Sequence, residues 1–386
     1  MSNLQSALEP VFQENFSVRG ELGASVSVWR EGREIVSLSA GARDRQHKEP
    51  WTTETMVLVY SATKGPAAAC VLKCLFDAAI PLDAPVAGVW PRFALAGKEK
   101  ITFAQVLSHQ AGLAALDHSP DVFDHAGVIR ELEQQAPLWQ PGRQHGYHPR
   151  TSGYLWDEIV RRVTGMALGH YWRKSFAEPL GLDFWMGLPA GRLKDVATLH
   201  APRVAPPEDD FLKAFAETGS LTNRAFSCPT GLLTVSSMNS AAARMSAFPA
   251  FGGIGSASAL ARLYGMLAGG GEDAGRRYLA PGALEAMSHT LTSGFDLVLR
   301  MDNAFSAGFL QDPVDAAGKK LRASFGPSAR AFGQVGAGGS VGFADPDRAI
   351  GFAYVMNQME PGVLPNAKSL LLIQRMYEAL DHGTVD

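Results

Sequence analysis

Alternating apolar and polar positions occur mainly toward the two ends of the chain, and this pattern predicts β-strands there. The first two alternating runs are separated by a short stretch containing Gly32, a spacing that predicts a β-hairpin. A third, shorter apolar run at 56–60 ends immediately before Ser61. Near the other end, a glycine-rich segment at 333–342 lies between two further apolar runs. The runs that predict strands are 22–29, 34–40, 305–310 and 350–356.

The pattern changes to a helical period beyond Pro66. Five apolar residues then recur at 3.6-residue spacing, which predicts a helix that turns one face to the core. Because proline is tolerated only in the first turn of a helix, residues 61–64 are expected at or near the helix start. Further helices are predicted at 104–108, 128–135, 153–163, 168–177, 256–267 and 367–380.

Strands at both ends with helices between them predict an α+β fold, in which the two ends of the chain build one sheet. We expect a domain formed by residues 1–78 and 236–386, with a mostly helical domain, 79–235, inserted into it. The functional site is expected at the interface of these two parts. The proline-rich, acidic stretch 201–210 is the one candidate linker.

Composition narrows the classes of function. The chain has 386 residues, of which 46% are apolar and 19% charged, as in folded globular proteins. A net charge of −3 with scattered basic residues gives no reason to expect binding to nucleic acid or to an anionic membrane surface. No uninterrupted apolar run approaches the length of a membrane span. Residues 1–20 lack the apolar core of a secretory signal, so a cytoplasmic location is expected.

The three cysteines support the same expectation. Cys70 and Cys74 are one helical turn apart, and Cys228 is distant in the sequence. Three cysteines do not make a closed disulfide framework, and no further metal ligands lie at suitable spacing. We therefore expect the cysteines to pack in the core. No metal or other cofactor is predicted.

The tetrad Ser61–Lys64, with the sequence SATK, is the first candidate for chemistry. Residues three apart on a helix share a face, so the Lys64 amine can reach the Ser61 hydroxyl. Burial and the positive end of the helix dipole both disfavour a charged amine. A neutral lysine can accept the serine proton and thereby activate the nucleophile. Taken alone, the tetrad is equally compatible with a capping serine followed by a solvated lysine.

Blocks in a consistent order on both sides of the tetrad remove this ambiguity. Together they resemble the serine β-lactamase-like superfamily, which includes the penicillin-binding proteins. The closest resemblance is to the family VIII carboxylesterases and the class C β-lactamases, over roughly residues 20–360. The matching blocks are 61–66, 80–86, 90–93, 101–113, 141–142, 146–148, 161–165, 336–340 and 355–357.

The resemblance implies a β-lactamase/transpeptidase-like fold, in which helices flank an antiparallel sheet and a mostly helical region is inserted. It also implies roles for particular residues. Ser61 is expected to be the nucleophile and Lys64 its general base. Tyr147 matches the second motif of the family and is expected to relay protons together with Lys64.

The third family motif maps onto residues 334–336. By resemblance, the backbone N–H groups of Ser61 and Ala337 are expected to form the oxyanion hole. Gln334, Gly336 and Gly338 are expected to line the substrate site, since glycines let a strand edge approach a substrate closely. His148, beside Tyr147, is expected at the rim of the site as a further substrate contact.

The chain departs from the family pattern at two positions. Pro149 stands where the family often has asparagine, which removes an amide that helps to position a β-lactam. Gln334 stands where lysine or histidine is usual, which removes a cationic anchor for a substrate carboxylate. Both differences favour an ester substrate over a β-lactam.

Two other patterns suggest competing sites. Residues 338–342 match the G-x-S-x-G elbow of α/β-hydrolases, with Ser340 as nucleophile. The elbow needs a strand before the serine and a helix after it, whereas glycines precede Ser340 and a turn is predicted after it. We therefore interpret Ser340 as structural. His145 is expected at the rim of the site, and His109 as a hydrogen-bonded structural residue.

Three functional hypotheses follow. The leading one is a serine carboxylesterase that cleaves short-chain, small-molecule esters through an acyl-Ser61 intermediate. The alternative is a β-lactam or amide hydrolase, or an acyltransferase, that uses the same residues. A non-catalytic scaffold of the same fold is disfavoured, because the two serine-activating side chains and the tyrosine are all retained. A homo-oligomer is compatible with the sequence.

Overall fold

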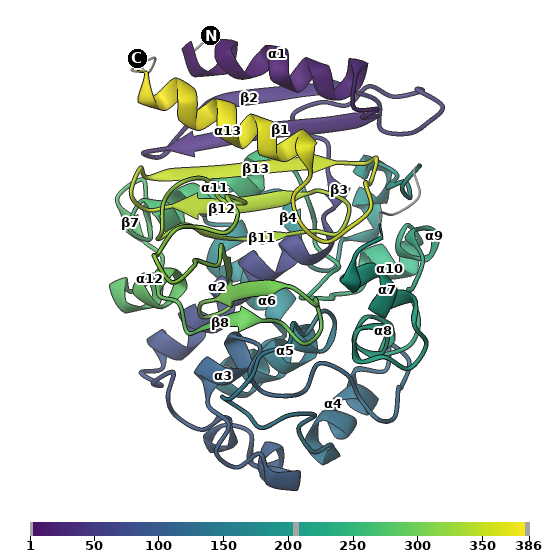
Figure 1. The fold of residues 1–386 in the computed structure, drawn as a ribbon, viewed down its shortest axis with the longest axis vertical. Coiled ribbons are helices and arrows are strands. Elements are labelled where there is room, and N and C mark those ends of the chain that lie inside the picture. The colour runs from purple at the N-terminus through teal and green to yellow at the C-terminus, as the bar shows by residue number, and fades with distance from the viewer. Residues whose placement is uncertain (1–2, 204–207, 383–386) are drawn as a thin grey trace.

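The two ends of the chain form one antiparallel sheet (Figure 1). The computed structural model describes residues 3–203 and 208–382. The strand order is β2-β1-β13-β12-β11-β10-β9-β8, so the first strands pair directly with the last one, which confirms the predicted sheet. The strands are β1 Gly23–Arg30, β2 Arg33–Gly41, β8 Thr292–Phe295, β9 Asp302–Phe305, β10 Leu310–Gln311, β11 Phe332–Val335, β12 Val341–Asp345 and β13 Ile350–Met356.

Helices cover both faces of this sheet. The α11 helix (Ala257–Ala268) packs against β1, β12 and β13. In Figure 1 it lies behind the strands, whereas α1 (Asn3–Ser17) and α13 (Ala367–Asp381) pack together in front of them. Every residue of β13 is buried as a result. A strand covered on both faces reads as a continuous apolar run, which is why 350–356 was recognisable in the sequence.

Short helices and loops fill the segment between the sheet strands. In Figure 1 α3, α4 and α5 form the end of the molecule farthest from the two chain ends. The helices are α2 Lys64–Asp77, α3 Phe103–Leu107, α4 His125–Gln134, α5 Thr151–Thr164, α6 Leu168–Trp172, α7 Asp210–Ala216, α8 Leu221–Ser227, α9 Val235–Met238, α10 Ala241–Met245 and α12 Pro281–Ser288. Single 3-10 turns are η1 Tyr60–Thr63, η2 Val86–Gly88, η3 Pro91–Gly97 and η5 Ala190–Asp195.

A second, three-stranded sheet supports the start of α2. Its order is β3 (Val57–Leu58), β5 (Ile254–Gly255) and β4 (Phe184–Trp185). The chain leaves β3, forms the turn η1 and enters α2, with Pro66 as the third helical residue. The predicted position of Ser61 and Lys64 at the helix start is therefore confirmed. A further two-stranded ribbon joins β6 (Glu272–Asp273) to β7 (Arg276–Arg277).

Two predictions of local structure need correction, and one helix was missed. The single strand expected at 305–310 is two strands, because a turn at 306–309 separates β9 from β10. Gly308 in this turn has a φ of 86° and packs against α2, where a side chain would lie 2.4 Å from the Ala68 Cβ. The helix expected at 168–177 becomes a wider, π-type turn over Arg173–Ala177. The α1 helix was not predicted.

The boundaries between domains stay a prediction. The candidate linker at 201–210 lies partly outside the described residues, because positions 204–207 are not among them. Within the described chain, no helix combines the length and the apolar character that crossing a bilayer requires.

Candidate functional site

Ser61 lies in η1, a turn whose backbone is strained and firmly held. Tyr60, immediately before it, has a φ of 45°, which costs a non-glycine residue about 1–3 kcal/mol. The Thr63 hydroxyl donates to the Tyr60 carbonyl and accepts a hydrogen bond of 2.8 Å from the Gly253 N–H. The Val59 N–H also donates to the Gly253 carbonyl, at 2.9 Å. The turn is therefore fixed to the segment that leads into β5.

Lys64 is completely buried, one turn after Ser61. Its Nζ lies 3.4 Å from the Ser61 Oγ and 2.9 Å from each of the backbone carbonyls of Pro149 and Ala250. Within the described chain, no carboxylate forms an ion pair with this amine. Burial without an opposing charge holds the pKa of Lys64 well below the ordinary value for lysine.

Two kinds of contact favour the charged form of Lys64 and oppose the effect of burial. The Tyr147 ring lies 4.6 Å from the Nζ, and such a contact stabilises an ammonium by about 0.5–2 kcal/mol. The carbonyls of Pro149 and Ala250 also accept hydrogen bonds from an ammonium. Burial is the larger influence and lowers the pKa of Lys64, which raises the share of the neutral amine.

The hydrogen-bond geometry suits a neutral amine. A neutral lysine has two N–H donors and one lone pair, and two carbonyl acceptors lie within 2.9 Å. When the carbonyls of Pro149 and Ala250 accept both N–H groups, the lone pair is left for the Ser61 hydroxyl. In its neutral form Lys64 is therefore placed to accept the proton of Ser61.

Tyr147 reaches the same hydroxyl from the loop that precedes α5. Its phenol is hydrogen-bonded to Ser61, and burial raises its pKa well above the ordinary value for tyrosine. The phenol is therefore protonated and can donate. Its backbone N–H donates to both oxygens of the Asp296 carboxylate, at 3.0 and 3.2 Å, and this contact fixes the loop.

Asp296 is a residue that the sequence reasoning missed. It is fully buried, and it also accepts hydrogen bonds from the backbone N–H groups of Val298 and Leu299 at 2.8 and 2.9 Å. Burial raises the pKa of this carboxyl. It follows Tyr147 by 149 positions and belongs to no motif, so no signal in one sequence pointed to it.

The predicted oxyanion hole is compatible with the backbone arrangement. Gly336 follows β11 and packs so closely against η1 that an added Cβ would lie 2.0 Å from the Val59 carbonyl oxygen. This contact brings residue 337 beside the turn that carries Ser61. Neither the Ser61 nor the Ala337 N–H donates a backbone hydrogen bond in the turns, loops or caps of the described chain.

Three residues expected to bind substrate have other contacts. The Gln334 side chain is buried and donates to the Gly308 carbonyl at 2.9 Å. The backbone N–H of Gly336 donates to the Ser340 carbonyl, and that of Gly338 to the Gly362 carbonyl. These donors are used within the protein, and the role of the three residues in lining the substrate site stays a prediction. The two glycines shape the turn by close packing.

His148 and His145 are buried and do not lie at a rim, which corrects their expected position, whereas contact of His148 with substrate stays a prediction. His148 is 1% exposed, and its ring nitrogens contact the Leu113 N–H at 3.0 Å and the Gly146 carbonyl at 2.7 Å. Burial lowers the pKa of His148 to about 3, so it is neutral. His145 is also buried and bonds the Thr292 hydroxyl.

His109, Ser340 and the three cysteines lie as the sequence predicted. His109 is buried and accepts a hydrogen bond from the His148 N–H at 3.2 Å, which confirms its structural role. Ser340 is 1% exposed and is followed by the strand β12 instead of a helix, so it does not form a nucleophile elbow. All three cysteines are buried and unpaired. In the described part of the chain, no group of three potential ligands could hold a metal ion.

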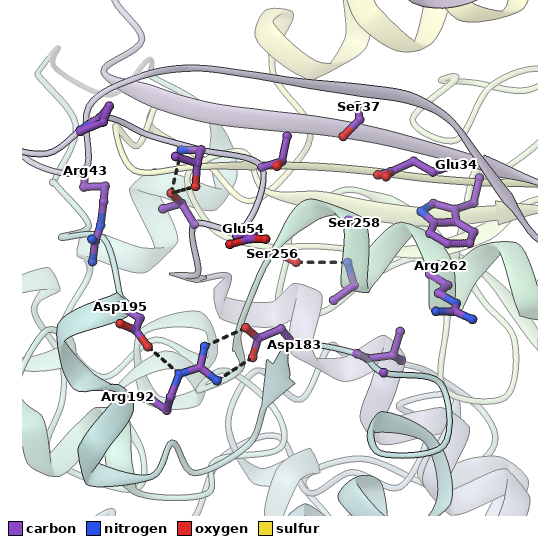
Figure 2. A pocket seen from close by; sticks show the side chains of 18 residues that line it. Glu34, Ser37, Arg43, Glu54, Asp183, Arg192, Asp195, Ser256, Ser258 and Arg262 are labelled. Atoms are coloured by element: carbon purple, nitrogen blue, oxygen red, sulfur yellow. Dashed lines mark hydrogen bonds and ion pairs between the residues drawn. The ribbon is translucent and has the colours of Figure 1, made fainter. Parts of the chain in front are cut away.

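A polar cavity of about 770 Å³ lies elsewhere, beside the three-stranded sheet (Figure 2). Figure 2 shows that Arg192 bridges Asp183 and Asp195 at its edge, at 2.8 and 2.5 Å. None of the three expected catalytic side chains is among the residues that line it. The predicted catalytic side chains therefore lie apart from this cavity.

Comparison with known proteins agrees with this arrangement. A family model described as "Beta-lactamase" matches residues 12–374, which is most of the chain. The chain belongs to the beta-lactamase family. The fold expected from the sequence is thereby confirmed, and the chain is a hydrolase of this family.

Relatives of this family member include proteins with esterase names. The esterase/beta-lactamase LipL of Mycobacterium tuberculosis is 31% identical over 362 residues, covering 90% of this chain and 80% of LipL. Among solved structures, a penicillin-binding protein homologue from Caulobacter crescentus is 36% identical with a TM-score of 0.88, and each chain is covered to 97%. A family VIII carboxylesterase is 32% identical with a TM-score of 0.86, again covering 97% of each chain.

Proposed function

We propose that this beta-lactamase family member is a serine carboxylesterase that cleaves short-chain esters through an acyl-Ser61 intermediate. One observation carries the proposal. Among the described residues, no carboxylate pairs with the fully buried Lys64 amine. The amine instead contacts two backbone carbonyls and the Ser61 hydroxyl. This arrangement is costly for a structural lysine, which would normally be solvated or paired. It is what a general base requires.

In the proposed reaction, Lys64 takes the hydroxyl proton while the Ser61 Oγ bonds to the carbonyl carbon of the ester. Negative charge develops on the carbonyl oxygen, where the N–H groups of Ser61 and Ala337 stabilise it. Collapse of the tetrahedral intermediate breaks the bond to the alkoxy group, and the proton passes to that oxygen through the Tyr147 hydroxyl. Water then attacks the acyl group and its proton moves to the same relay. The bond between the acyl carbon and the Ser61 Oγ breaks, the relay returns the proton to this oxygen, and the carboxylic acid leaves.

Covalent labelling tests the nucleophile. We expect a fluorophosphonate to form one adduct, located at Ser61 by mass spectrometry of the digested protein. The Ser61→Ala variant should form none, whereas Ser340→Ala should react like the wild type because Ser340 is buried away from solvent. An adduct at Ser340, or an unlabelled wild-type protein, would remove the basis of the proposal and favour a non-catalytic scaffold.

The second candidate is β-lactam hydrolysis, which the name of LipL favours. The site itself favours esters. A β-lactam antibiotic carries a carboxylate that needs donors, but the Gln334 amide is bound to Gly308 and the residue at 149 is a proline. Replacing a charged donor by a neutral one costs about 1–2 kcal/mol.

We therefore expect kcat/KM for p-nitrophenyl butyrate to exceed that for nitrocefin by at least about a hundredfold, or about 2.7 kcal/mol. The lactam amide is also a harder acyl donor than an activated ester, and this effect acts in the same direction. Both rates are measured on one preparation, with Ser61→Ala as the blank for each substrate. Comparable turnover of the two substrates would assign the protein to the β-lactam hydrolases instead.

A further inference from the structure

Arg150 is a buried cation that ties three segments together beside the site. It precedes α5 and is only 6% exposed. Its guanidinium donates to the carbonyl of Phe226 at 3.3 Å and to that of Gly231 at 2.6 Å. Within the described chain it forms no ion pair with a carboxylate. A buried arginine that donates to backbone carbonyls holds chain segments in place by directional hydrogen bonds and not by an ion pair.

Arg150 and the aromatic ring that it contacts each follow one of the two residues whose carbonyls bind Lys64. Arg150 directly follows Pro149, and its guanidinium stacks on the Phe251 ring with the central carbon 4.9 Å from the ring centre. Phe251 directly follows Ala250. The carbonyls of Pro149 and Ala250 both accept from the Lys64 Nζ at 2.9 Å. The stacked pair therefore links two acceptors that are about 100 positions apart in the sequence.

We propose that Arg150 is a positioning residue for Lys64: by stacking on Phe251 and binding the carbonyls of Phe226 and Gly231, it fixes the spacing of the two carbonyls that orient the amine. This inference rests on the proposed function, because orientation of the amine affects a reaction only if Lys64 is the base.

Loss of these Arg150 contacts should change both the direction and the charge of the Lys64 amine. If the two carbonyls separate, the amine loses a fixed acceptor and water gains access to it. A solvated lysine keeps its proton to higher pH than a buried one. The other titratable side chains around the amine are Tyr147, His109 and His148, and burial favours the neutral form of each of them.

The decisive variant is Arg150→Lys, which keeps the positive charge but loses the planar, two-armed guanidinium. We expect kcat/KM for p-nitrophenyl butyrate to fall about tenfold, with most of the loss in kcat. The acid limb of its pH profile should move about one pH unit higher, because the base has become easier to protonate. The limb position does not depend on how much of the protein is folded, so it separates positioning from stability.

Phe251→Leu provides a second variant if Arg150→Lys does not fold. It removes the stacking surface and leaves the hydrogen bonds of Arg150 in place, and the acid limb should move in the same direction. Arg244→Lys is the matched control. Arg244 is partly buried and donates to the Ala197 carbonyl at 3.3 Å, but it contacts neither Lys64 nor its acceptors. This control should leave the pH profile unchanged.

An unchanged acid limb in both Arg150→Lys and Phe251→Leu would overturn the inference. A shift of the acid limb in Arg150→Met that is absent from Arg150→Lys would also overturn the inference, because loss of the positive charge alone would then explain the shift. Failure of the proposed function is detected by a separate experiment, in which the fluorophosphonate does not react with Ser61 of the wild-type protein. A labelled wild type with an unchanged variant profile rejects only the role of Arg150.

Discussion

Replacing Lys64 by methionine is expected to lower kcat for p-nitrophenyl butyrate by about 10²–10⁴-fold, the range found when a general base is removed. Methionine is unbranched and apolar, so it can fill the buried space of the lysine stem without adding an unpaired charge. What it lacks is the lone pair that faces the Ser61 hydroxyl. The loss should therefore appear in the acylation rate, measured as the pre-steady-state release of p-nitrophenol.

The control for this substitution is Lys73→Met on the same helix. Lys73 is at the surface, where it pairs with Asp77 at 2.9 Å, and it should be replaceable without a change in kcat. A Lys64→Met protein that is folded and retains more than about a tenth of the activity would show that another group is the base.

The same substitution should change the dependence on pH. In the wild type, kcat/KM should fall as pH decreases through the pKa of Lys64, because only the neutral amine accepts a proton. Because burial holds this pKa well below the ordinary lysine value, the acid limb should lie at a lower pH than a solvated lysine would give. In Lys64→Met this acid limb should disappear, and a limb that persists would belong to a different group.

The second large effect is expected for Tyr147→Phe, with kcat reduced by about 10²–10³-fold. The ring contacts remain in this variant, including the edge contact with His109 at 4.9 Å and the stack on Phe305. Only the hydroxyl that bonds Ser61 is removed. The loss should be smaller for substrates with good leaving groups such as p-nitrophenol, because they need less protonation on departure.

The matched control is Tyr264→Phe. The Tyr264 hydroxyl is also buried and lies against Gly65 at the start of α2, but it has no hydrogen-bond partner within the described residues. Its removal should leave kcat unchanged. The double variant Lys64→Met/Tyr147→Phe should lose far less than the product of the single losses, because the two groups serve one proton transfer. Losses that multiply would mean that they act independently.

Much of the fold could be predicted because the local pattern and the final environment agree. The sheet strand Ile350–Met356 is covered on both faces, so it reads as one apolar run in the sequence. The helix α2 was also recognisable, although it is buried on all sides from Lys64 to Leu72 and not only on the one face that its pattern predicted. The strand predicted at 305–310 failed for the opposite reason. Its residues are all apolar or small, but Gly308 must pass close to Ala68, and that contact turns the chain.

The sequence alone determined the order of the motifs, the spacing of Ser61 and Lys64, and the helix start that Pro66 imposes, because these depend on neighbours within one turn. Tertiary structure decided the charge and direction of the amine. These depend on the carbonyls of Pro149 and Ala250, which only the folded chain brings to Lys64. It also decided that His148 is buried and that Asp296 holds the Tyr147 loop. Burial and long-range contact have no local signature, whereas a helix turn does.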